Sequence, residues 1–173
     1  MRTHQDVPIH WDYKENSNQT PQEIVGFSFT LPTANIYEGF FHPSPIWPPD
    51  SILAGNTVDL VFGPKIEVDP IQHNHPLQVM DIVLKVITEY LSLLPSRCIS
   101  YTCDDNDGRG AARQRLFVKT FHRNSTPKLE LFHQPINIYG QVLQFGLIYH
   151  QDNNHQTSIQ QTLFTELRLA ESK

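Results

Sequence analysis

The sequence predicts a single α+β domain, in which a largely antiparallel sheet carries a long central helix, a shorter helix and a C-terminal helix, packed mainly on one face. The order of the periodic segments supports this prediction: strands, a long helix, a strand, a shorter helix, two strands and a final helix. The length of 173 residues suits one domain. A chain of this size buries roughly 70% of the surface that its unfolded form exposes, so folding requires no metal or disulfide.

The N-terminal residues differ in composition from the rest. Residues 1–22 are rich in Asn, Gln and Asp and show little periodicity, which is typical of a flexible arm. Ile9, Trp11 and Tyr13 alternate, however, and this spacing is equally consistent with an edge strand. We therefore divide the chain into an N-terminal arm and one α+β domain, residues 23–173.

Two strands and a proline-rich loop open the domain. In the strand predicted at 24–31 we expect one apolar face, formed by Val25, Phe27, Phe29 and Leu31. A second strand is predicted at 36–41. Residues 42–51 contain four prolines and are predicted to be a loop, because proline cannot donate to a β-ladder. We expect Trp47 to lie on the sheet; the alternative is a polyproline segment that presents Trp47 to an aromatic groove.

The long helix is predicted at 76–94, after a third strand at 57–62. Pro76 suits the first helical position, and Pro95 stops the helix. One side of the helix is apolar, so we expect it to pack on the sheet. This apolar stripe consists of Met80, Val83, Ile87, Tyr90, Leu91 and Leu94.

The second half of the domain contains further strands and two more helices. A strand at 115–121 is the alternative to the shorter helix that we expect after the Asp-Gly turn. Thr157 with Gln160 matches a capping box at the start of the C-terminal helix. The predicted elements before that helix are a strand at 97–103, a helix at 109–122 and a strand pair at 128–134 and 141–151.

Composition and charge restrict the partners that we expect. The net charge of −5 argues against a generic nucleic-acid binder, although a local basic patch is a candidate. No apolar run approaches the roughly 20 residues that a membrane-spanning helix needs, so we expect no membrane partner. The residues of the basic patch are Arg109, Arg113, Arg115, Lys119 and Arg123.

The two cysteines are predicted to stay reduced. Cys98 and Cys103 fall in one predicted strand, on opposite faces and roughly 16 Å apart, which is too far for a disulfide. The polar start of the chain lacks the pattern of a signal peptide. Both observations predict a cytoplasmic protein.

The segment CDDNDGRGAARQR, residues 103–115, holds the densest chemistry of the chain. An EF-hand is excluded, because its first and twelfth ligand positions would fall on Cys103 and Gln114. The oxygen ligands that Mg²⁺ prefers are nevertheless present, and a magnesium site is one hypothesis. Its ligands would be Asp104, Asp105 and Asp107.

The same turn has two further interpretations. A helix that begins near Gly108 would present free N–H groups to an anion, and guanidinium groups would add to the site. These groups belong to Arg109, Arg113 and Arg115. In the purely structural interpretation, which the residue chemistry favours, Asp107 caps the helix and Gly108 relieves the turn. Asp104 or Asp105 would then pair with Arg109 or Arg113.

Outside residues 103–115, no sequence motif supplies the residues of a catalytic site. The tripeptide HNH, residues 73–75, lacks the partner ligands of a nuclease and is interpreted as the loop before the long helix. The chain holds no nucleophile elbow, P-loop or dinucleotide fingerprint, and neither cysteine has a histidine near it in the sequence. We therefore expect no cofactor and no resident metal.

Segment 99–123 resembles the central signature of a small bacterial family of unknown function. That signature is a strand ending in Cys-Asp, a turn with Asp-Gly-Arg or Asp-Gly-Lys, and then Ala-Arg-x-Arg-x-Phe. The matching positions are Cys103, Asp104, Asp107, Gly108, Arg109, Ala112, Arg113, Arg115 and Phe117. The resemblance extends over about residues 24–170 and departs at Thr120 and Phe121, where many members carry a Trp. It implies a single-domain cytosolic bacterial protein and transfers no activity.

Two classes of function follow from these observations. The first is a non-catalytic interaction module with a protein partner or self-association, such as one component of a bacterial defence or toxin–antitoxin system. The arm, the loop at 42–51 and the lack of a catalytic set favour this class. The second is a small metal-dependent phosphodiesterase or nuclease, or a nucleotide-binding protein, that uses the segment Asp104–Arg115.

Overall fold

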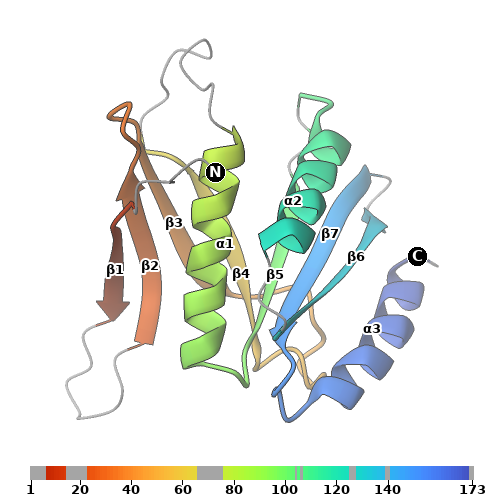
Figure 1. Ribbon diagram of the computed structural model, residues 1–173. Coiled ribbons are helices and arrows are strands. Elements are labelled where there is room, and N and C mark those ends of the chain that lie inside the picture. The colour runs from red at the N-terminus through yellow and green to blue at the C-terminus, as the bar shows by residue number, and fades with distance from the viewer. Residues whose placement is uncertain are drawn as a thin grey trace.

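The computed structural model describes residues 7–14, 23–65, 76–103, 105, 107–124, 128–138 and 141–171. The strands are β1 (Ile9–Lys14), β2 (Glu23–Thr30), β3 (Ile36–Pro43), β4 (Thr57–Pro64), β5 (Cys98–Cys103), β6 (Leu129–Ile138) and β7 (Gln141–His150). The helices are α1 (Pro76–Leu93), α2 (Gly110–Asn124) and α3 (Gln156–Glu171). All strands belong to one sheet with the order β1-β2-β3-β4-β5-β7-β6 (Figure 1). The predicted α+β fold class is confirmed.

Helix α1 is the crossover between the only parallel pair of strands among the described residues, β4 and β5. Parallel neighbours need such a connection, whereas the other strand pairs of this sheet are antiparallel. The predicted apolar stripe faces the sheet, and Val83, Ile87 and Leu91 are fully buried. None of the helices in the described part of the chain is long and apolar enough to cross a membrane.

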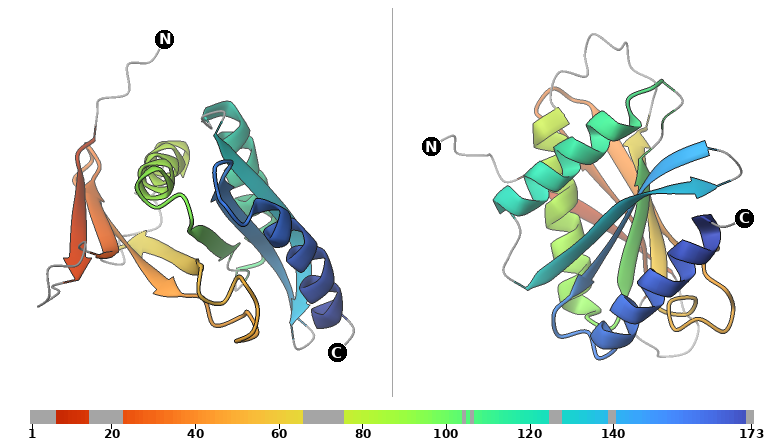
Figure 2. Two further views of the ribbon diagram at one scale, coloured as in Figure 1. Left: turned by 90° about the horizontal axis from the view of Figure 1, so that it is seen from below. Right: turned by 90° about the vertical axis from the view of Figure 1, so that its right-hand side faces the viewer.

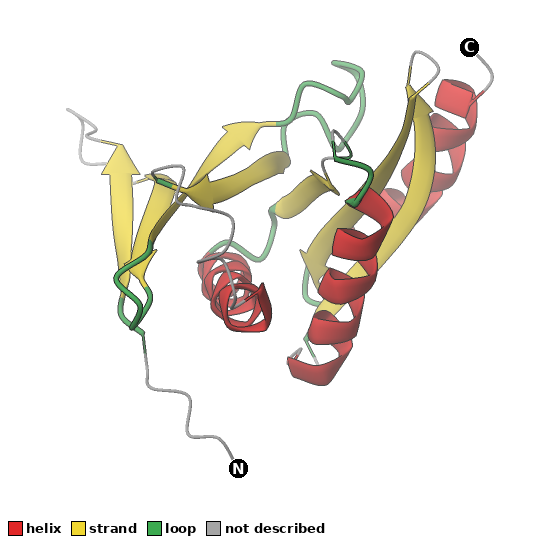
Figure 3. Ribbon diagram, turned by 90° about the horizontal axis from the view of Figure 1, so that it is seen from above, coloured by secondary structure: helices red, strands yellow, loops and turns green. Residues whose placement is uncertain are grey.

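The apolar core has two parts, one on each face of the sheet. Ile99 and Ile148 join the part that packs against α1 and α2, whereas Phe145 joins the part that packs against α3. Successive strand residues point to opposite faces, so α3 covers the face opposite α1 and α2. Figure 2 and Figure 3 show β6 and β7 between α2 and α3. Two of the three helices thus share one face.

Strand β1 is an edge strand, in line with the alternation at its N-terminal end. Its pairing with β2 is irregular, because the register shifts between Asp12 and Tyr13. As a result Ile24 is buried in the core, while Val25 is only half-buried. The prediction that Val25 belongs to the apolar face is therefore wrong, and the physical reason is a β-bulge.

The loop between β3 and β4 packs on the α3 face of the sheet. The Trp47 side chain is only 6% exposed and meets the edge of the Phe145 ring, with centroids 5.9 Å apart. Leu53 is fully buried beside it. The Cys98 N–H donates to the Asn56 carbonyl at 2.8 Å, which ties the loop to the start of β5. The predicted packing of Trp47 on the sheet is confirmed, and its ring is not accessible to an aromatic groove.

Helix α3 begins at Gln156, two residues earlier than the predicted capping box requires. The His155 N–H donates to the Asn153 side-chain oxygen at 2.9 Å, and the Gln156 N–H donates to the Asn153 carbonyl at 3.0 Å. Gln160 instead donates to the Tyr149 hydroxyl at 3.2 Å. The predicted capping box of Thr157 and Gln160 is wrong, because a turn formed by Asn153 starts this helix.

Candidate functional site: the Asp-Gly turn and the open sheet face

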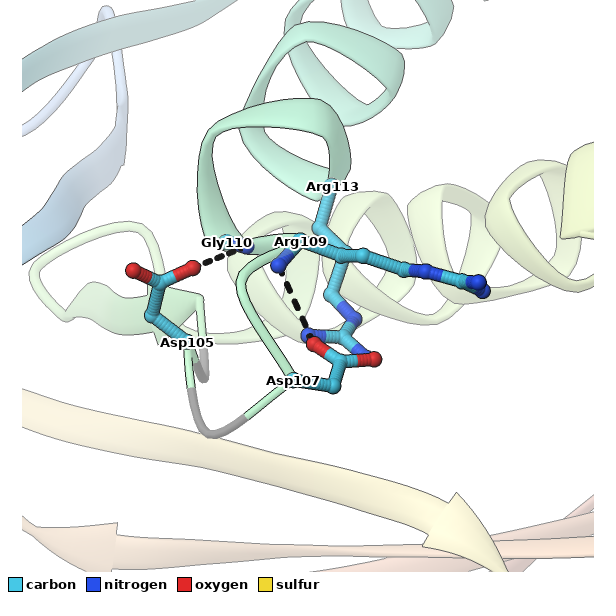
Figure 4. A network of polar contacts seen from close by, with 5 residues as sticks. All are labelled: Asp105, Asp107, Arg109, Gly110 and Arg113. Carbon is cyan, nitrogen blue, oxygen red and sulfur yellow. Dashed lines mark hydrogen bonds and ion pairs between the residues drawn. The ribbon is translucent and has the colours of Figure 1, made fainter.

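The charged segment forms the turn between β5 and α2 (Figure 4). Gly108 has a φ of 70°, a left-handed conformation that glycine adopts without strain. Its N–H donates to the Asp105 carbonyl at 2.9 Å and closes the turn. The chain is helical from Gly110 to Asn124, so the helix prediction is confirmed and the alternative strand is wrong.

Asp105 holds the first turn of α2. Its Oδ1 accepts a hydrogen bond from the Gly110 N–H at 2.6 Å. A Cβ at position 110 would lie 2.9 Å from that same oxygen, so a side chain there would push the carboxylate away. An oxygen acceptor in this place satisfies one of the backbone donors that a helix leaves free at its start.

Asp107 forms an ion pair with Arg113. The two terminal nitrogens of Arg113 donate to the two carboxylate oxygens of Asp107 at 2.8 and 2.7 Å. The Asp107 Oδ1 also accepts the Arg109 N–H at 3.1 Å. The hydrogen bonds from Arg113 lower the pKa of the Asp107 carboxyl, and the Arg109 N–H acts in the same direction. The left-handed Gly108 fits the structural interpretation of this turn, but the predicted roles of the two carboxylates are wrong. Asp105, not Asp107, accepts the N–H of the first helical residue, and Asp107, not Asp105, pairs with an arginine, because the turn brings Asp107 closer to Arg113.

The turn brings together only part of the predicted ligand set. Asp105, Asp107 and Arg113 meet within it, whereas Arg109 contributes only its backbone and its guanidinium points away from Asp107 (Figure 4). Arg115 is exposed on α2 and has no ion pair among the described residues. Two candidates, Asp104 and the tripeptide at 73–75, lie outside the described residues. Within the described ranges, no three His, Cys, Asp or Glu side chains form a group that could hold a metal ion.

Neither cysteine is a poised nucleophile. Burial raises the pKa of Cys98 to about 12 and that of Cys103 to about 11. The Cys103 thiol donates to the Gln114 side-chain oxygen at 3.4 Å, and Gln114 in turn donates to the Tyr101 hydroxyl at 3.2 Å. Both thiols are free, as predicted, and they stay protonated at neutral pH.

A second candidate site is the face of β1–β4 that points away from α1. Large apolar side chains are exposed on this face: Ile36 by 40%, Phe40 by 42% and Val61 by 56%. Phe40 and Val61 are direct cross-strand partners. Figure 3 shows α1 on one side of these strands and none of the three helices on the other. We call the surface formed by Ile36, Phe40, Val61 and their polar neighbours the open sheet face.

Polar side chains surround the apolar residues of the open sheet face. Glu38, on β3 between Ile36 and Phe40, pairs with Lys65 at 3.6 Å. His42 follows on the same face, with its ring 6.2 Å from that of Phe40. The sequence carries a signal for this surface, because β3 has apolar residues on both faces: Ile36 and Phe40 on one, Tyr37 and Phe41 on the other. Sequence reasoning did not use that signal.

Comparison of this chain with protein-family models, with curated proteins and with solved structures found no match in any of the three. The resemblance of segment 99–123 to a bacterial family therefore stays a prediction.

Proposed function

We propose that this protein is a non-catalytic interaction module that binds a protein partner through the open sheet face. The observation that supports this is the exposure of Ile36, Phe40 and Val61 on two adjacent strands. Exposed apolar surface is costly in water, and its burial in an interface stabilises a complex by about 25 cal/mol per Å². Contiguous apolar side chains rimmed by polar ones are typical of a binding surface.

The composition of the open sheet face favours a separate partner over a permanent homodimer. Three large apolar side chains lie among polar neighbours such as Ser28, Glu38 and His42. Obligate homodimer interfaces are more apolar than this, whereas exchangeable complexes use surfaces that are about as polar as the rest of the protein. We expect the partner to contribute apolar side chains to the centre of the contact.

The proposal extends to the setting of the protein. The free thiols of Cys98 and Cys103 support a reducing, cytoplasmic compartment. The resemblance of segment 99–123 supports a bacterial source. A component of a defence or toxin–antitoxin system is one setting that fits such a module.

The alternative, a metal-dependent phosphodiesterase or nuclease, has less support. Both carboxylate oxygens of Asp107 accept hydrogen bonds from Arg113, and one oxygen of Asp105 accepts from Gly110. A metal ion at this turn would have to displace these donors. The interaction module needs no such rearrangement.

A pair of double variants tests the proposal. Phe40→Ser with Val61→Thr removes the apolar centre of the open sheet face. Leu77→Ser with Leu93→Ser removes equally exposed apolar side chains from the ends of α1 and is the matched control. We expect affinity capture from the native host to recover a partner with the wild type and the control, but not with the open-face variant, while both variants keep their thermal midpoint.

Two results would change this conclusion. If the wild type, the open-face variant and the control variant capture the partner equally well, the open sheet face is not the binding surface. If light scattering shows a dimer of the wild type, and Phe40→Ser with Val61→Thr dissociates it, the open sheet face binds a second copy of this chain.

A further inference from the structure

Helix α2 carries an unusual concentration of positive charge. Five basic residues and no acidic ones lie between Arg109 and Arg123. The chain as a whole has a net charge of −5, so the residues outside this segment carry a net charge of −10. This segment is therefore basic, whereas the rest of the chain is acidic on balance.

Only part of this charge is neutralised within the protein. Arg113 pairs with Asp107, and Arg123 donates to Asp81 of α1 at 2.6 Å. Arg109, Arg115 and Lys119 are exposed, and their side chains form no ion pair or hydrogen bond with the described residues.

Two of the unpaired cations share one side of the helix, and the third, Arg109, directly precedes it. Arg115 and Lys119 are four residues apart, on the side opposite the buried Phe117 and Phe121. The exposed His122 lies one turn further on, and Arg109 stands at the N-terminal end. Figure 2 shows α2 on the outside of the molecule. We call Arg109, Arg115, Lys119 and His122 the basic helix face.

Folding alone does not account for the basic helix face. Like charges four residues apart on a helix repel each other, and an acidic residue in either place would stabilise the helix. No acidic side chain of α2 offsets the repulsion between Arg115 and Lys119. A partner that supplies negative charge would offset it.

We propose that the basic helix face binds an acidic segment of a partner protein. Carboxylates accept charge-assisted hydrogen bonds from Arg and Lys, so the two surfaces are complementary in charge. A nucleic acid extends its charge beyond the basic helix face and is repelled by the net charge of −10 on the rest of the chain, whereas a short acidic segment can stay within that face. The phenylalanines of α2, Phe117 and Phe121, are buried, so they give unpaired bases no surface to stack on.

This surface is independent of the open sheet face. α2 packs on the same side of the sheet as α1, whereas the open sheet face points to the other side. The two surfaces thus have different chemistry and different positions.

A fluorescent peptide of about ten glutamates, titrated at low salt, is the probe. Arg115→Glu with Lys119→Glu reverses the centre of the basic helix face. Lys14→Glu with Lys65→Glu changes the net charge by the same amount at the end of β1 and just after β4, away from α2, and is the control. We expect the helix variant to weaken peptide binding about tenfold and the control to change it less than about twofold. Arg115→Gln with Lys119→Gln is a milder variant, for use if the reversal impairs folding.

The results separate the possible occupants. No binding to the wild type, or an equal loss in both double variants, would overturn the proposal, because only net charge would then matter. If a DNA duplex binds more tightly than the peptide, and its binding also depends on Arg115 and Lys119, the ligand of the basic helix face is a nucleic acid and not an acidic protein segment. Phe40→Ser with Val61→Thr should leave peptide binding unchanged, so failure of this proposal is distinguishable from failure of the open sheet face.

Discussion

The aromatic ring of Tyr101 lies directly against the backbone of Gly146, its cross-strand partner in β7. A Cβ at position 146 would overlap the ring. The same relationship recurs between β2 and β3, where the ring of Phe27 covers Gly39. An aromatic ring over a glycine fills the space that the missing side chain leaves, and it fixes the register of the two strands.

Gly146→Ala is therefore expected to destabilise the protein by about 1–3 kcal/mol. Tyr101 cannot move aside easily, because its hydroxyl accepts a hydrogen bond from Gln114 and its ring packs on Phe117 with centroids 4.5 Å apart. Urea unfolding monitored by circular dichroism measures the change in the free energy of unfolding.

Gly55→Ala is the matched control for this substitution. A Cβ at position 55 would meet no atom within 4 Å, so we expect a change of less than about 0.5 kcal/mol. If the two variants lose the same stability, the contact between Tyr101 and Gly146 does not constrain the sheet.

The elements that sequence predicts well are those with strong local signals. Helix α1 has a proline at its start, a proline after its end and a continuous apolar stripe, and its predicted bounds agree with the structure to within one residue. The core face of β2 was predicted less well, since the bulge places Ile24 rather than Val25 in the core. A β-bulge arises from the pairing of two strands, so the sequence of one strand alone does not reveal it.

The Asp-Gly turn shows a similar limit. Composition predicts that its charges neutralise one another, and Gly108 does adopt the left-handed conformation that a turn glycine favours. The backbone geometry of the turn decides which carboxylate reaches which hydrogen-bond donor. The roles of Asp105 and Asp107 therefore could not be assigned from their spacing in the sequence. The apolar residues on both faces of β3 are visible in the sequence, but which of the two faces stays exposed depends on where the helices pack.

The ion pair of Asp107 with Arg113 predicts an acid-dependent stability. Arg113 lowers the pKa of the Asp107 carboxyl below its usual value of 3.8. A carboxyl with a lowered folded-state pKa stabilises the protein above its unfolded pKa, and the contribution is lost as the pH falls through the folded pKa. We expect Asp107→Asn to melt at a lower temperature than the wild type near neutral pH. This difference should shrink as the pH falls below 3.8 and vanish once the pH is below the lowered pKa of Asp107 in the folded protein. A difference that is independent of pH would show that the ion pair is not its cause.

The cysteines should react slowly in the folded protein. With a pKa of about 11 for Cys103 and about 12 for Cys98, only a small fraction of either thiol is ionised at pH 8. We expect Ellman's reagent to label Cys103 first, since it is half-buried while Cys98 is fully buried, and the rate to rise about tenfold per pH unit. Cys103→Ala should remove the first phase. Immediate labelling of both thiols in the native protein would contradict the burial described above.

Trp47 offers a direct probe of the loop between β3 and β4. The chain has two tryptophans, so Trp11→Phe leaves Trp47 as the only one. Because its ring is 6% exposed and packs on Phe145, we expect blue-shifted emission and protection from iodide quenching. Trp47→Ala should lower the free energy of unfolding by about 3–5 kcal/mol. Emission typical of exposed indole would show that the loop does not pack on the sheet.

Divalent metals are expected to leave the melting temperature unchanged. Any metal that binds the folded state preferentially raises the melting temperature, so a thermal scan with Mg²⁺ and Mn²⁺ detects binding at the Asp-Gly turn. The Asp107 carboxylate already accepts two hydrogen bonds from Arg113, and Asp105 accepts the Gly110 N–H, so a metal ion gains these oxygens only by breaking contacts that hold α2. A saturable rise that disappears in Asp105→Asn with Asp107→Asn would restore the metal-dependent alternative. Metal binding at this turn would also require Arg113 to leave Asp107. The pH dependence of Asp107→Asn tests independently whether the ion pair of Asp107 with Arg113 stabilises the metal-free protein.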